Sequence, residues 1–200
     1  MKTDVILVSS RGSRIETALR QADFVADYKS LSPKGALHLR LLTEEMMGMM
    51  RSITGETDGE FWIEDQDGEF QLHLRVSTVM DSDKREQLLS ASTTGKNESA
   101  RGFMGRLRNF FDLGADADVA ACVGPLYTGI YAESSSVAAL DYEWSMLRYE
   151  QRLTSRMETD PDAKQEWDEL EKSVVARLAD EVKISIRGRT VEMIILKKLV

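Results

Sequence analysis

Residues 61–76, which read FWIEDQDGEFQLHLRV, hold the clearest structural signal in the chain. Asp67-Gly68 is a strong tight-turn signal, so Phe61–Glu64 and Phe70–Val76 are predicted to form a β-hairpin. Apolar side chains alternate with polar ones along the second strand, which predicts one buried and one polar face. His73 falls on the polar face, and we expect it to be solvated rather than catalytic.

The segments on either side of this hairpin predict an α+β fold. We expect a strand at Asp4–Ser9 and helices at Arg11–Tyr28 and about Ala36–Ile53. A second hairpin, Val182–Ile186 with Val191–Leu196, is predicted near the end of the sequence. Strands and helices do not alternate singly, which argues against a doubly wound parallel sheet. The prediction is a two-layer α/β sandwich, in which a mixed, mostly antiparallel sheet carries helices on one face.

A helical insertion is expected at about 114–181, inside a single domain that spans residues 1–200. Two helices are predicted there, Val137–Met157 and Pro161–Asp180, with Asp160 as the N-cap of the second. They form either a partner-binding arm or an insertion that covers the sheet or dimerises. Asp116–Tyr131 fits a helical period, but its glycines and proline disturb that period, so helix and strand both stay open.

The composition is that of an ordinary globular chain and excludes several classes of protein. A formal net charge of −8 argues against general nucleic-acid binding, which needs a positive surface. No apolar run is long enough to cross a bilayer, and the first residues look like a strand rather than a signal peptide. Cys122 is the only cysteine, and neither histidine has a metal-binding neighbour, so no metal site is predicted. These points together favour the cytoplasm.

Residues 92–111, STTGKNESARGFMGRLRNFF, form a polar, glycine-bearing loop that leads into an amphipathic helix. The first amide groups of a helix are unpaired and lie at the positive end of its dipole. Hydroxyls, two cations and glycines beside such an end are suited to hold a phosphate group. Basic residues outnumber acidic ones between Lys84 and Arg108, whereas the reverse holds between Glu133 and Glu181. The alternative is a solvated loop that caps an ordinary helix.

The order of elements and these residues resemble the GHKL (Bergerat) ATP-binding fold, which includes histidine kinases and anti-sigma-factor serine kinases. The resemblance covers roughly Asp4–Leu113 and Val182–Leu199, and its first elements look most like the anti-sigma branch. It implies ATP or ADP as ligand, a regulatory protein as partner, and a catalytic glutamate on the second helix. A homodimer is a further expectation.

In that family the second helix carries a glutamate and, four residues later, an asparagine that binds magnesium. Glu45 matches the glutamate, or Glu44 if the alignment shifts by one residue. The asparagine position is then Met49 or Gly48, and neither side chain can bind a hard cation. The resemblance therefore implies Glu45 as the catalytic base and argues against a bound magnesium ion.

Two further motifs of the family match this chain unevenly. Asp81 stands where the family has an adenine-reading aspartate, although the glycines that accompany it are absent and a helix cap is the alternative. The loop described above resembles the family's ATP lid. The residues that the resemblance assigns to nucleotide binding are Asp81, Thr93, Thr94, Gly95, Lys96, Arg101, Gly102 and Gly105.

The sequence thus predicts an ATPase- or kinase-like regulatory domain that is impaired in catalysis. The alternative is a protein–protein interaction module that keeps the fold without binding nucleotide. A domain built only for oligomerisation through the acidic helices is a third, more remote reading.

Overall fold

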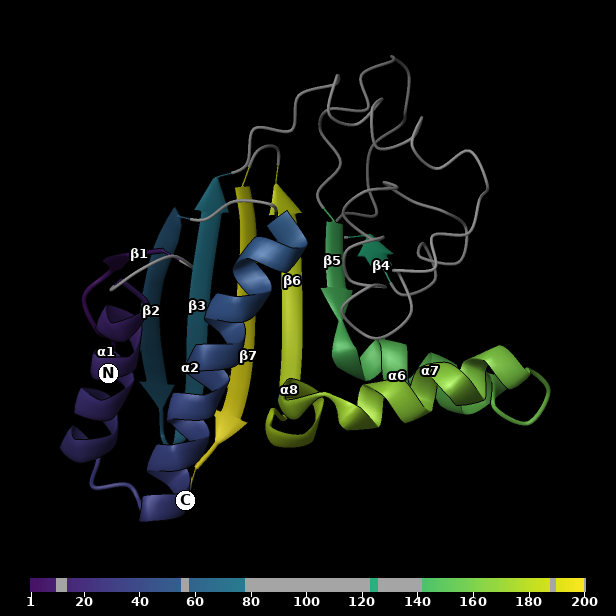
Figure 1. The fold of residues 1–200 in the computed structure, drawn as a ribbon, viewed down its shortest axis with the longest axis horizontal. Helices are drawn as coiled ribbons and strands as arrows, with labels where there is room; N and C mark the ends of the chain where they lie inside the picture. The colour runs from purple at the N-terminus through teal and green to yellow at the C-terminus, as the bar shows by residue number, and fades with distance from the viewer. Residues whose placement is uncertain (10–13, 55–57, 78–122, 126–141, 188–189, 200) are drawn as a thin grey trace.

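The computed structural model describes residues 1–9, 14–54, 58–77, 123–125, 142–187 and 190–199 (Figure 1). The polar loop and amphipathic helix predicted at residues 92–111 lie outside these ranges. The described helices are α1 (Arg14–Tyr28), α2 (Pro33–Thr54), α6 (Met146–Arg156), α7 (Pro161–Lys172) and α8 (Val174–Leu178). The described strands are β1 (Ile6–Ser9), β2 (Asp58–Gln66), β3 (Glu69–Ser77), β4 (Val123–Pro125), β5 (Tyr142–Ser145), β6 (Glu181–Arg187) and β7 (Thr190–Lys198).

The described strands form one sheet in the order β1-β2-β3-β7-β6-β5-β4. Each strand is antiparallel to the strand beside it. Both predicted hairpins are present, and the pairing of β3 with β7 joins them at the centre of the sheet. The predicted α+β class is therefore confirmed, and among the described strands no pair is parallel.

Helices α1 and α2 lie on one face of this sheet (Figure 1). Helix α1 packs against β1 and β2, and α2 crosses β3 and β7. Along the strands, the apolar residues of the alternating pattern point toward these two helices. Burial of this apolar sheet face against α1 and α2 stabilises the packing of the two layers. The core between the layers includes Val25, Leu39, Leu42, Met46, Phe61, Ile63, Leu72, Leu74, Val182 and Ile195.

An ion pair between a buried carboxylate and a partly exposed lysine links the first hairpin to the end of α1. Asp65 is buried, accepts a hydrogen bond from the Gly68 amide at 3.0 Å, and pairs with Lys29. Burial alone raises the pKa of this carboxyl group, but Lys29 and the Gly68 amide outweigh it and the net shift is downward. Asp67 and Gly68 both have positive φ angles, 53° and 85°, as a tight hairpin turn requires.

The predicted helix at Val137–Met157 is wrong at residues 142–145, and residues 137–141 lie outside the described ranges. Residues Tyr142–Ser145 form strand β5, which pairs with β6, and the helix begins only at Met146. Ser145 is the N-cap, and its side chain accepts a hydrogen bond from the Arg148 amide. The apolar spacing of this segment fits a helix, but pairing along the edge of β6 overrides it.

The helix predicted at Pro161–Asp180 is broken into two. Helix α7 ends at Lys172, and Ser173 then serves as N-cap of α8 by accepting a hydrogen bond from the Ala176 amide. The start of α7 is as predicted, since Asp160 Oδ1 accepts from the Asp162 amide at 2.9 Å. In the ambiguous segment 116–131, the structure describes only Val123–Pro125, which form β4. The insertion therefore contributes two strands to the sheet as well as helices.

Candidate functional site

Helix α2 carries the one predicted site residue that lies within the described ranges, Glu45. Its side chain is half-buried, and that of Glu44 is exposed. The predicted nucleotide-binding residues lie outside the described residues: Asp81, Thr93, Thr94, Gly95, Lys96, Arg101, Gly102 and Gly105. The structure thus places the predicted base on α2 and does not test its proximity to the others.

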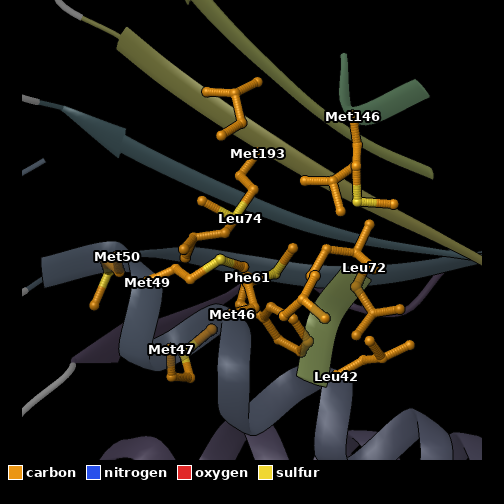
Figure 2. Close-up of a cluster of buried hydrophobic side chains, with 14 of the residues drawn as sticks. Leu42, Met46, Met47, Met49, Met50, Phe61, Leu72, Leu74, Met146 and Met193 are labelled. Carbon is orange, nitrogen blue, oxygen red and sulfur yellow. The ribbon is translucent and has the colours of Figure 1, made fainter. Parts of the chain in front are cut away.

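Met49, four residues after Glu45, is part of the hydrophobic core. Only 2% of its surface is exposed, and it lies with Met46, Met50 and Leu74 between α2 and the sheet (Figure 2). Its place is fixed by the helical spacing of apolar residues along α2, which buries one side of the helix. A thioether in an apolar core binds no hard cation, so this position carries no magnesium ligand.

The alternative alignment uses Glu44 and Gly48, which lie on the solvent side of α2. Both are exposed, and a Cβ atom built on Gly48 would meet nothing within 4 Å. The position therefore has room for a side chain but offers none. In either alignment, α2 supplies one carboxylate and no second ligand.

A second cluster of functional groups lies on the other face of the sheet, around Trp62 and His73. The two residues are directly opposite each other in the hairpin, and their rings stack at 4.7 Å with an angle of 8°. Lys2 Nζ and Arg75 Cζ lie 5.2 Å and 4.9 Å from the centre of the Trp62 ring system. Cations at these distances are attracted to the indole face.

The prediction that His73 is solvated is wrong. The residue lies on the polar face, as its place in the alternation indicated, but it is only 7% exposed because the Trp62 ring covers it. Its Nδ1 lies 3.5 Å from Glu192 Oε1 and its Nε2 lies 3.9 Å from Glu64 Oε1. Burial lowers the pKa of His73, and the two carboxylates oppose that shift without cancelling it.

The aromatic rings of Trp62 and His73 are covered by each other and by the surrounding side chains. Trp62 is itself buried and donates from Nε1 to Glu64 at 2.9 Å. Hydrogen bonds from Lys2 and from Trp62 lower the pKa of Glu64. The hairpin register fixed by Asp67-Gly68 is the sequence signal that pairs Trp62 with His73. The arrangement stabilises the sheet, and with its aromatic faces covered it offers no stacking surface to a ligand.

A third polar cluster fixes the start of α6. Glu181 is buried and accepts hydrogen bonds from Ser145 Oγ and from the Leu147 and Val182 amides. Burial, and then the charge of Glu181, raise the pKa of Glu150. A negatively charged carboxylate interacts favourably with the positive end of the helix dipole at the N-terminus of α6. The cluster around Glu181 therefore holds the start of α6 against β6.

Among the described residues, no group of His, Cys, Asp and Glu side chains is arranged to hold a metal ion. None of the helices in the described ranges is long and apolar enough to cross a membrane. A comparison with models of protein families finds no match, and a comparison with curated proteins finds none either.

Proposed function

We propose that this chain is a cytoplasmic regulatory domain of the ATPase/kinase-like type that binds ATP or ADP and is impaired in catalysis. The observation that carries the proposal is the burial of Met49 beside a half-buried Glu45 on α2. In the family that the sequence resembles, this pair would supply the base and the magnesium ligand. Here the base is retained and the ligand position belongs to the core.

The position of Glu45 on a helix that covers the sheet supports the assignment to the ATPase/kinase-like type. Helix α2 is the second helix of the chain, on which the resemblance places the catalytic glutamate, and Glu45 is not part of the buried stripe of that helix. The nucleotide itself is assigned to Lys96, Arg101 and their neighbours from the sequence alone. A regulatory role follows because a domain that binds nucleotide without turning it over acts through a partner protein.

Thermal unfolding with ATP or ADP, in the presence of magnesium and of EDTA, tests the proposal. A ligand at 100 times its dissociation constant stabilises a protein by about 2.7 kcal/mol. We expect both nucleotides to raise the melting temperature, and we expect EDTA to leave that rise unchanged. A rise that needs magnesium would contradict the argument from Met49.

Two substitutions locate the site. Lys96→Ala and Arg101→Ala should each abolish the nucleotide-dependent rise, since both cations are assigned to the phosphates. Lys164→Ala is the matched control, because Lys164 is an exposed lysine on α7. If millimolar nucleotide raises the melting temperature of none of these proteins, the alternative function, an interaction module without nucleotide, replaces the proposal.

A further inference from the structure

Helix α1 presents a stripe of aromatic and charged residues to solvent. Arg20, Phe24, Asp27 and Tyr28 are all exposed and follow one another at helical spacing. Phe24 and Tyr28 are 63% and 67% exposed, and their rings stack at 6.2 Å. Single exposed apolar residues are common on proteins, but a stacked aromatic pair this open to water is typical of an interaction surface.

The stripe lies beside an edge of the sheet. Gln21, three residues before Phe24, donates from Nε2 to the Asp4 carbonyl at 2.7 Å, which brings this side of α1 next to the strand edge. Strand β1 is the last strand at that end of the sheet. Val5 and Leu7 are 51% and 70% exposed there. Leu7 alternates with the core-facing Ile6 and Val8 and pairs with Glu60, so its side chain lies on the sheet face opposite α1. The aromatic stripe on α1 is therefore an exposed surface of its own beside this edge.

We propose that this face binds a second copy of the chain, with the two α1 helices antiparallel across a twofold axis near Phe24. The stripe is self-complementary in charge, because Arg20 lies one turn before Phe24 and Asp27 about one turn after it. An antiparallel overlay places Arg20 of each copy opposite Asp27 of the other. The two Phe24 side chains then meet near the axis, where interface energy concentrates, and Tyr28 of each copy lies about one turn further out.

The charges on the stripe are open to such a partner. Arg20 contacts Thr17 Oγ1 at 3.4 Å within its own helix. Among the ion pairs between described residues, none includes Arg20 or Asp27. A second copy supplies both missing partners at once. The proposal concerns α1 and does not depend on nucleotide binding.

Sedimentation equilibrium over a concentration series tests the dimer. The chain should behave as a monomer–dimer equilibrium, and Phe24→Ser or Tyr28→Ser should raise the dissociation constant roughly 30-fold or more. Both side chains are exposed, so circular dichroism should show the native fold. Leu147→Ser, which changes an exposed apolar residue on α6, should leave the constant unchanged. A wild-type chain that stays monomeric throughout, or equal weakening by Leu147→Ser, would overturn the proposal.

A charge exchange tests the orientation of the helices. Arg20→Asp and Asp27→Arg should each weaken the dimer, because each brings like charges together across the axis. The double variant restores both pairs with reversed polarity, so its dissociation constant should return toward that of the wild type. The two positions lie about two turns apart on one helix and do not contact each other, so recovery requires a second copy. A double variant as weak as the single ones would overturn the antiparallel arrangement.

Discussion

Met49→Asn places the family's magnesium ligand at the position where the resemblance expects it. The structure predicts damage instead of a metal site, because Met49 is only 2% exposed. Loss of the buried apolar side chain costs about 1.5–3 kcal/mol. An amide left without hydrogen bonds in the core costs about 1–3 kcal/mol more. The free energy of unfolding should therefore fall by about 2.5–6 kcal/mol, a large part of the stability of a typical domain.

Urea unfolding followed by tryptophan fluorescence measures this loss, with an unchanged slope as evidence that the folded state is the same. Met49→Leu is the matched control, since a substitution that conserves volume costs less than about 1.5 kcal/mol. Gly48→Asn adds the same amide one residue earlier, on the exposed side of α2, and should cause no such loss. A cost below about 1 kcal/mol for Met49→Asn would refute the burial argument. So would the appearance of magnesium-dependent nucleotide binding in that variant.

Three further substitutions test other parts of the structure. Gly48→Ala should stabilise the chain by about 0.5–1 kcal/mol in urea unfolding, because alanine favours the helix and meets no atom there; a loss of stability would contradict the exposed position. Gly59→Ala should cost about 1–3 kcal/mol in the same assay, since its Cβ would lie 2.8 Å from the Arg75 carbonyl oxygen, and a neutral result would show that the strands can separate. The folded-state pKa of His73 is lowered, so the unfolded chain binds its proton more readily and stability should fall as the pH drops below about 6.5. His73→Phe keeps a ring on Trp62 and should remove that part of the pH dependence; an unchanged pH profile would mean that His73 is not the group responsible.

Local signals in the sequence were sufficient for the hairpins and for the first two helices. Asp67-Gly68 sets the turn of β2–β3 through its own backbone conformation, and the alternation after it places Phe70 and Leu72 in the core. The helix at 33–54 follows from the spacing of its buried residues. These features depend on neighbours within a few residues, so a single sequence reveals them.

The features that the sequence did not reveal depend on distant partners. Strand β5 exists because Trp144 and its neighbours pair with β6, some 40 residues later along the chain. His73 is buried because Trp62 stacks on it across the hairpin, a contact that alternation alone does not register. For the candidate site, the structure tests the surroundings of Glu45 and Met49, whereas the assignment of Lys96 and Arg101 to phosphate remains a prediction from the sequence.

The pairing of β3 with β7 has a consequence for how the chain folds. Each hairpin forms from residues close in sequence, but the centre of the sheet joins residues 69–77 to residues 190–198. Closing so long a loop is entropically costly and slow, so we expect the two hairpins to form first and their union to limit the folding rate. Until β7 arrives, one edge of β3 is unpaired and open to other strands. A folding intermediate of this protein is therefore most exposed to aggregation at what later becomes the middle of its sheet.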